Sequence, residues 1–316
     1  MRRAAALLVF PLLAAAAAAG CGSSSSSSSA QGTSNSAVTV TGKFGAAPKV
    51  TIPAEKAGGT LYIKTLIQGT GSPLTTAQTL KGNFALYDWS GTTHKLLGST
   101  YTTGSPTLFV GQVIPGLEKA IIGEKVGSRV LAVIPPKDAF GSKGNPNAGV
   151  KGTDTLVFVI DLDQAYTNSS GVAGNQTSNG GSGLPTVTAA PGKAPAVTIP
   201  SSTPPKSLQV KALIKGTGPK VAAGQELLVQ YTGINWRTKK AFDSSWSRSQ
   251  PYPVQIGAGQ VLKGWDTGLV GQTVGSRVLL VIPPADGYGT AGQATAGIKG
   301  TDTLIFVVDI ITAVGA

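Results

Sequence analysis

The stretch VLKGWDTGLVGQTVGSRVLLVIPP, residues 261–284, contains the two patterns that decide the fold. In its first half, five apolar residues recur at intervals of three and four: Val261, Leu262, Trp265, Leu269 and Val270. This spacing predicts one short helix with an apolar face. The second half, SRVLLVIPP, predicts a strand, because it is rich in β-branched residues and is too short for a typical helix. It ends at a Pro pair, which stops the hydrogen-bond ladder of a sheet.

Three further apolar runs predict strands around this pair of elements. TLVFVIDL (155–162) and TLIFVVDII (303–311) are rich in β-branched and aromatic residues. In ELLVQYTGINW (226–236), apolar and polar residues alternate along part of the segment. Several antiparallel strands with one short helix predict an α+β domain in which a curved sheet wraps the helix.

The opening stretch has an earlier counterpart, VIPGLEKAIIGEKVGSRVLAVIPP, at residues 113–136. GVKGTDTLVFVID (149–161) likewise recurs as GIKGTDTLIFVVD (297–309), and APKVTIP (47–53) recurs as APAVTIP (194–200). So long a period predicts a duplicated domain rather than a solenoid. The sequence, at 316 residues, is long enough for two domains.

The N-terminus predicts export. Arg2 and Arg3 precede an apolar run from Ala4 to Ala19, and the run ends in AAGC, which resembles a bacterial lipobox with Cys21 as the lipidated residue. The expected location is the outer face of the bacterial cell membrane, where the protein is lipid-anchored and extracytoplasmic. An ordinary signal cleaved near Ala19, with Cys21 left as a thiol, is the alternative.

Composition sets the remaining boundaries. Polyserine after Cys21 predicts a flexible tether, and the Gly/Ser/Thr-rich stretch between the repeats has almost no large apolar residues, so we expect a linker without a core. The predicted organisation is a signal peptide at 1–21, a disordered tether at 22–42, a first domain at 43–166, a linker at 167–194 and a second domain at 195–316.

Charge and residue counts exclude several functions. The 26 Lys and Arg exceed the 14 Asp and Glu, but they are scattered and the chain is expected to be exported, so no nucleic-acid partner is predicted. A single Cys excludes intramolecular disulfides and Cys-cluster metal sites, and a single His, His94, leaves little for a catalytic triad or a His-based metal site. GAGQVL lacks the third Gly and the Lys of phosphate loops.

Seven segments of the second domain, in order, carry a resemblance to a known family: VQYTG, KKAFDSS, QPYPVQIG, QVLKGWDTGL, VGSRVLLVIPP, GYG and TLIFVVDI. In this order the chain resembles the FKBP-type peptidyl-prolyl isomerases. The resemblance implies the FKBP half-barrel, no cofactor and no metal, proline-containing polypeptides as clients, and binding of macrolide inhibitors.

The reaction itself needs few polar groups. Cis/trans isomerisation of a Xaa-Pro bond crosses a barrier of about 18–20 kcal/mol set by amide resonance, and no covalent bond changes. Apolar surroundings disfavour the planar, more polar amide, and one or two hydrogen bonds can hold the twisted state. An aromatic cup with few polar atoms is therefore the expected site.

The resemblance implies a role for each residue of this cup. Trp265 is the floor under the proline ring, the Leu262 amide and the Tyr288 hydroxyl donate to substrate carbonyls, and Asp243 is the carboxylate at the edge, oriented by Tyr231. Phe242 and Phe306 complete the catalytic set with Tyr231. The substrate-binding residues implied are Tyr252, Val254, Val261 and Ile298.

The first domain lacks the polar half of this set. Leu117, Phe84 and Phe140 stand where the second domain has Trp265, Tyr231 and Tyr288, while Lys95 and Leu96 face Phe242 and Asp243 in the alignment. We therefore expect the first domain to fold like the second but to catalyse weakly or not at all. A non-catalytic peptide-binding or chaperone lipoprotein with the same fold is the alternative for the whole chain.

Overall fold

The structure is a computed structural model that describes residues 35–103, 107–109, 113–176, 179–190, 192–248 and 250–315. Its contacts divide the chain into two compact units, one built mainly from residues up to Gln164 and the other mainly from Ala165 onward. We call them the first and the second domain and describe each by itself. The predicted signal peptide, Cys21 and the polyserine run lie outside the described residues.

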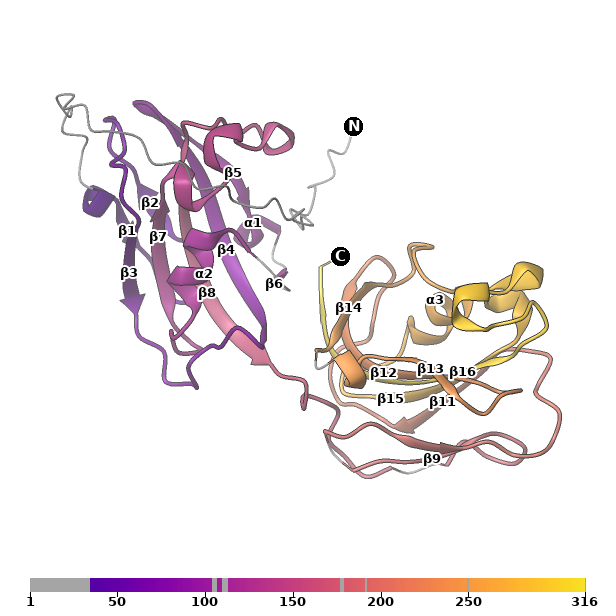
Figure 1. The fold of residues 1–316 in the computed structure, drawn as a ribbon. Helices are drawn as coiled ribbons and strands as arrows, with labels where there is room; N and C mark the ends of the chain where they lie inside the picture. The colour runs from indigo at the N-terminus through magenta and orange to yellow at the C-terminus, as the bar shows by residue number, and fades with distance from the viewer. Residues whose placement is uncertain are drawn as a thin grey trace, which may run out of the picture. The chain divides into compact units, whose positions relative to one another are not determined.

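The second domain is an antiparallel sheet with the strand order β11-β15-β16-β12-β13, and β14 pairs with β12. Its strands are β11 (Gln209–Ile214), β12 (Glu226–Asn235), β13 (Ala241–Ser244), β14 (Tyr252–Gln255), β15 (Arg277–Ile282) and β16 (Leu304–Val314). The one α-helix described in it is α3 (Lys263–Leu269), and short 3-10 turns lie at η5 (Trp246–Arg248), η6 (Pro284–Asp286), η7 (Gly289–Ala291) and η8 (Ala294–Ala296). The predicted α+β class is confirmed, with the sheet around a short helix (Figure 1).

Helix α3 lies close to the sheet because two of its residues are glycines. A Cβ on Gly264 would come within 2.7 Å of Ile282, and one on Gly268 within 2.6 Å of Leu280, so no larger side chain fits without movement. Trp265 and Leu269 are the large apolar residues that the helix buries. Val261 and Leu262 precede the helix, and Val270 follows it.

The first domain repeats this topology, with the order β3-β7-β8-β4-β5 and β6 paired with β4. Its strands are β3 (Tyr62–Ile67), β4 (Thr79–Ser90), β5 (Thr93–Ser99), β6 (Thr107–Phe109), β7 (Arg129–Ile134) and β8 (Thr155–Tyr166). Its helices are α1 (Thr100–Thr103) and α2 (Pro115–Ile121), and its 3-10 turns are η1 (Asn35–Ala37), η2 (Pro136–Asp138), η3 (Gly141–Lys143) and η4 (Pro146–Ala148). Helix α2 takes the place of α3, with Gly116 close to Ile134.

Each sheet also holds a buried ion pair between its two central strands. Arg277 donates from Nε and Nη2 to the two carboxylate oxygens of Asp309, at 2.6 and 2.7 Å, and Arg129 binds Asp161 at the same two distances. All four side chains are at least 97% buried. The VGSRV repeat therefore carries a bidentate pair that helps to specify each sheet.

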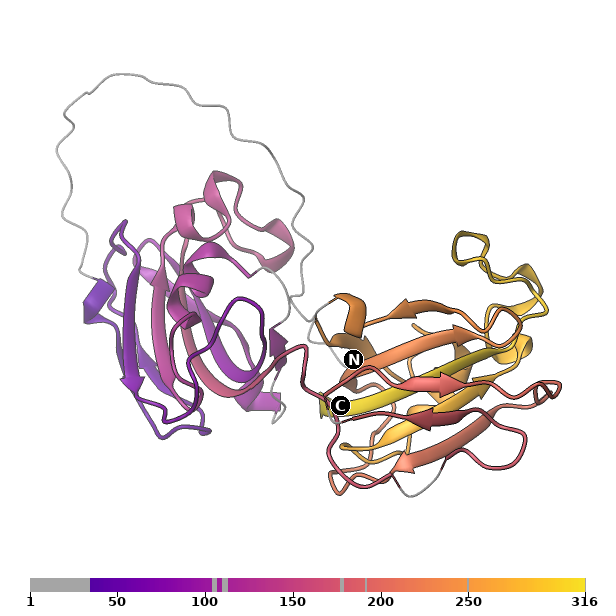
Figure 2. The same ribbon diagram turned by 60° about the horizontal axis from the view of Figure 1, so that its bottom comes forward.

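The outer face of each sheet is covered by a two-stranded hairpin that the sequence did not predict. β9 (Thr186–Thr188) pairs with β10 (Ala196–Thr198) in the second domain, and β1 (Thr39–Thr41) pairs with β2 (Lys49–Thr51) in the first. In Figure 1, β9 lies on the side of the sheet opposite α3, and Figure 2 brings this face forward.

These hairpins correct the predicted boundaries. Leu184 and Val187 pack with Trp236 and Leu279 in an outer apolar cluster, so the prediction that residues 167–194 contribute to no core is wrong for this segment. Val38 is buried in the corresponding cluster of the first domain, which therefore begins before residue 43. In a Thr-Val-Thr strand only one residue is apolar, and composition alone does not detect so small a contribution.

Candidate functional site

Trp265 lies in an apolar cluster on the helix side of the second sheet. The rings of Tyr231 and Phe306 meet it edge to face, with centroids 5.3 and 5.2 Å away and interplanar angles of 86° and 85°. Phe242 meets Phe306 in the same way at 5.6 Å and 89°. Edge-to-face contacts of this kind add to the free energy of burial and fix ring orientations.

The structure brings together the residues predicted for the aromatic cup, whereas the predicted lipidation site Cys21 lies outside the described residues. Val254, Ile298, Tyr231, Trp265 and Phe306 are buried members of one cluster. Phe242, Val261, Leu262 and Tyr288 pack against it while remaining partly exposed. Tyr252 lies at its edge, with its ring 5.7 Å from that of Tyr231 and 42% of its surface exposed. Their catalytic and binding roles stay predictions.

Phe242 and Phe306 approach so closely because Gly233 lies beneath them. A Cβ at this position would come within 2.8 Å of the Phe306 ring and 2.9 Å of the Phe242 ring. Leu86 stands at this point of the first domain, directly opposite Gly98, as Gly233 stands opposite Asp243. A leucine there takes up volume that the two rings use in the second domain.

The acid at the rim is held by two partners. The Tyr231 hydroxyl donates to Asp243 Oδ2, and Arg248 Nη1 donates to Asp243 Oδ1. Arg248 Nη2 also donates to the Tyr231 hydroxyl at 2.6 Å, and its guanidinium lies over the rings of Tyr231 and Tyr252, 5.4 and 5.8 Å from their centroids. The sequence analysis missed Arg248, whose approach to Asp243 depends on the turn η5.

Burial raises the pKa of the Tyr231 hydroxyl, and the bond to Asp243 raises it further. Burial followed by the charge of Asp243 also raises the pKa of Tyr288. Both hydroxyls therefore keep their protons at neutral pH and can donate hydrogen bonds.

Two donors point to a role in binding a polar group. Within the described residues, neither the Leu262 amide nor the Tyr288 hydroxyl has a hydrogen-bond acceptor. Leu262 is held in place by Asp266, because the Asp266 carboxylate accepts from the Gly257 and Gly259 amides at 2.7 and 2.9 Å and so fixes the turn before α3. These donors lie where the resemblance places contacts to substrate carbonyls.

The first domain has the framework of this site without its polar groups. Leu117 is buried on α2 where α3 carries Trp265, and Phe84 lies 6.1 Å from Phe158 at a tilt of 45°. Phe140 precedes the turn η3 as Tyr288 precedes η7.

The strand register corrects one predicted correspondence. Tyr231 N–H donates to Ser245 Oγ at 2.8 Å, and Phe84 N–H donates to Thr100 Oγ1 at 2.9 Å, so Ser245 and Thr100 are equivalent. Counting back, Gly98 rather than Leu96 matches Asp243, and Leu97 rather than Lys95 matches Phe242. The β4–β5 hairpin has a shorter turn than β12–β13, which shifted the alignment. The first domain still has neither the aromatic residue nor the acid.

Other kinds of site have little support in the described part of the chain. It contains no group of three or more His, Cys, Asp or Glu that could hold a metal ion. None of its helices has the length and apolar character needed to cross a membrane.

Comparisons with known proteins agree with this geometry. The model of the FKBP-type peptidyl-prolyl cis-trans isomerase family matches residues 76–163 and again residues 218–311. The FK506-binding protein of Streptomyces anulatus is 43% identical over 117 residues, which are 37% of this chain and 94% of that protein. A probable FK506-binding protein of Corynebacterium glutamicum is 35% identical over 119 residues, 38% of this chain and 98% of that protein. FK506-binding protein 2 of Dictyostelium discoideum is 46% identical over 92 residues, 29% and 68% of the two chains.

Proposed function

Because this chain belongs to the FKBP-type peptidyl-prolyl cis-trans isomerases and carries two FKBP domains, we propose that the second domain supplies its isomerase activity. The observation that supports this assignment is the group of Tyr231, Asp243 and Arg248 at the rim of the Trp265 cluster. The first domain has Phe84 and Gly98 in place of the tyrosine and the acid, and it contributes little or no catalysis.

The proposed site works by holding the twisted amide. The proline ring packs on Trp265 between Tyr231 and Phe306, and the buried rings keep water from the reacting bond. Rotation about the bond removes amide resonance, so the apolar cluster opposes the twisted state less than the planar one. The Leu262 amide and the Tyr288 hydroxyl hold the flanking carbonyls in the twisted geometry.

Exported proline-containing polypeptides are the proposed substrates. The same cluster is the proposed site for FK506-type macrolides, since relatives of this chain are named as FK506-binding proteins. A macrolide seated there would compete with the peptide.

The N-terminal signal supports an extracytoplasmic enzyme anchored through lipid on Cys21. Mass spectrometry of the mature N-terminus tests this. A diacylglycerol on Cys21 is expected, and a mature chain that starts near Ala19 with a free thiol would contradict it.

Trp265→Leu in the two-domain protein tests the assignment of the active domain. The substitution copies Leu117, and we expect kcat/KM for a Xaa-Pro peptide to fall at least about tenfold, equivalent to about 1.4 kcal/mol of transition-state stabilisation. Macrolide affinity should fall as well. The matched control is Leu117→Ala, which should leave both measurements unchanged.

The outcomes separate the two domains. A folded Trp265→Leu variant with full activity, together with a slow Leu117→Ala variant, would place catalysis in the first domain. The two-domain protein is used because a chain beginning at residue 195 would lose Leu184 and Val187 from its core.

A further inference from the structure

The KGTDTL repeat gives each domain a buried aspartate in the same backbone setting. Asp302 Oδ2 accepts from the Lys299 amide at 2.9 Å, and Asp154 Oδ2 accepts from the Lys151 amide at 2.8 Å. Each lies near a strand end that carries a buried tryptophan: Trp236 directly follows β12, and Trp89 is the next-to-last residue of β4. The residues before and after these tryptophans differ between the domains.

In the second domain a guanidinium from the same chain satisfies the aspartate. Arg237, which follows Trp236, donates from Nε and Nη2 to the two oxygens of Asp302, each at 2.7 Å. Asn235, which precedes Trp236, donates to Asp302 Oδ2 at 2.7 Å. The bonds from Arg237 are the main reason that the pKa of Asp302 lies well below its usual range. The Arg237 side chain stays partly exposed beside a pocket of about 420 Å³.

The first domain has neither the guanidinium nor the amide, although the Ser90 side chain still forms a hydrogen bond with Asp154. Ser90 follows Trp89 where Arg237 follows Trp236, and Asp88 precedes it where Asn235 precedes Trp236. A second carboxylate thus lies beside the Asp154 carboxylate. Burial and the charge of Asp154 raise the pKa of Asp88. Asp88 is 97% buried, and its Oδ1 atom has no hydrogen-bond partner in the described part of the chain.

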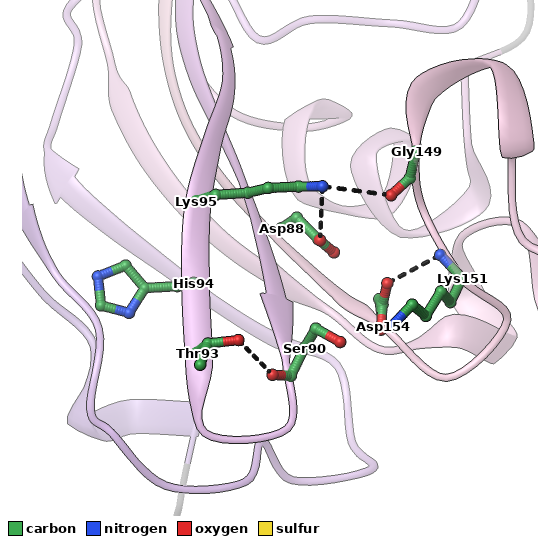
Figure 3. A pocket seen from close by; sticks show the side chains of 8 residues that line it. All are labelled: Asp88, Ser90, Thr93, His94, Lys95, Gly149, Lys151 and Asp154. Atoms are coloured by element: carbon green, nitrogen blue, oxygen red, sulfur yellow. Dashed lines mark hydrogen bonds and ion pairs between the residues drawn. The ribbon is translucent and has the colours of Figure 1, made fainter.

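These residues line a pocket of about 210 Å³, several times the roughly 30 Å³ of a water molecule in the liquid. Figure 3 shows Asp88 and Asp154 on facing sides of it, with Ser90 beside them and the Gly149 carbonyl at its far edge. His94 points away from this group.

Two lysines line the pocket without replacing the missing guanidinium. Lys95 Nζ is 3.7 Å from Asp88 Oδ2 and 3.4 Å from the Gly149 oxygen, and its side chain is 58% exposed, so the ion pair is loose. Lys151 supplies Asp154 with its backbone amide. A loose, exposed pair of this kind contributes little to stability and is easily displaced.

We propose that this pocket binds the guanidinium group of an arginine side chain supplied by another polypeptide, in the place that Arg237 fills within the second domain. A planar guanidinium offers five donors, enough to bind Asp154 bidentately as Arg237 binds Asp302 and also to reach Asp88. Lys95 then swings out toward solvent. The first domain thus gains a binding role that does not depend on isomerase activity.

NMR titration of the two-domain protein with Nα-acetylarginine amide tests the proposal. Saturable shifts are expected at the backbone amides of Ser90, Gly149 and Lys151. Nα-acetylcitrulline amide, a neutral isostere, should give none, and Nα-acetyllysine amide should bind at least about tenfold more weakly, because an ammonium lacks the bidentate geometry. Lys299 and Gly297, at the filled site of the second domain, are the internal control and should not respond.

Two substitutions sharpen the test. Ser90→Arg should fill the pocket from within the chain, abolish the shifts and raise the unfolding temperature of the first domain. Ser90→Ala, the matched control, removes the hydroxyl only and should still bind. Equal shifts with citrulline, equal shifts at Lys299, or undiminished binding in folded Ser90→Arg would each overturn the proposal, as would the absence of any arginine-dependent shift.

Discussion

The Tyr231 hydroxyl donates to the Asp243 carboxylate across the β12–β13 pair, and this bond joins the aromatic cluster to the acid at its rim. Arg248 closes the group by donating to both partners. The acid is therefore held by two neighbours, while Tyr231 stays in contact with Trp265.

Tyr231→Phe should keep the ring contacts and lose the bond. A hydrogen bond to a charged group contributes about 1.5–3 kcal/mol, so we expect a loss of stability of that order and a fall in kcat/KM of about tenfold. Urea unfolding and a peptide isomerisation assay measure the two effects. Phe84→Tyr in the first domain is the reciprocal control and should leave the rate unchanged. An unaltered rate in folded Tyr231→Phe would show that the hydroxyl has no part in catalysis.

Asp88→Asn should stabilise the first domain at neutral pH. The folded-state pKa of Asp88 is raised above its usual value of 3.8, so its favourable contribution is present below about pH 3.9 and is lost as the pH rises through the folded-state pKa. Thermal unfolding should show a higher midpoint for Asp88→Asn at pH 7 and little difference at pH 3. The reciprocal substitution in the second domain, Asn235→Asp, places a carboxylate beside Asp302 and should lower the thermal unfolding midpoint of that domain at pH 7. A gain from Asp88→Asn that is equally large at pH 3 would contradict this electrostatic explanation.

Val187→Asp should destabilise the second domain even though it lies in the segment predicted as linker. Val187 is fully buried in β9, whereas Thr186 beside it is exposed. An unpaired buried charge costs about 3 kcal/mol or more, and Thr186→Asp should cost almost nothing. Denaturant unfolding of the two variants provides the comparison. If both behave like the parent protein, the hairpin is not part of the folded core.

Arg277→Met removes one partner of the buried pair with Asp309. An uncompensated buried carboxylate costs about 3–5 kcal/mol, so the free energy of unfolding of the second domain should fall by that amount. Arg129→Met should likewise destabilise the first domain. It should leave the rate of peptide isomerisation unchanged at temperatures where the second domain is folded. The double variant Arg277→Met with Asp309→Leu should recover most of the loss, since the unpaired charge is gone. A failure to recover would mean that packing, not charge, dominates at this position.

The strands and the helix around the site could be predicted because their patterns are local. The spacing of Trp265 and Leu269 predicted α3, and the runs SRVLLVIPP (276–284) and TLIFVVDII (303–311) predicted β15 and most of β16. The cluster of site residues followed from the resemblance of seven segments to one family.

Three features could not be predicted, each for a physical reason. Each strand of the outer hairpins packs a single valine on the sheet, buried in β9 and partly buried in the other three strands, and one apolar residue is too weak a pattern to predict a strand. Arg248 lies in a polar stretch, and only the turn η5 brings it back to Asp243. The match of Gly98 to Asp243 depends on the length of the hairpin turn, which determines the strand register. The residue types in the two hairpins do not indicate this length.

The paired arginines Arg129 and Arg277 make the same buried bond in both domains, although the aromatic clusters beside them have diverged. The residues that help to specify the sheet are thus different from the residues of the candidate site. The first domain has the same strand order as the second, although Phe84, Phe140 and Gly98 stand where the second has two hydroxyls and an acid. Substitutions at the rim can therefore change the site of one domain while the buried pair keeps its sheet intact.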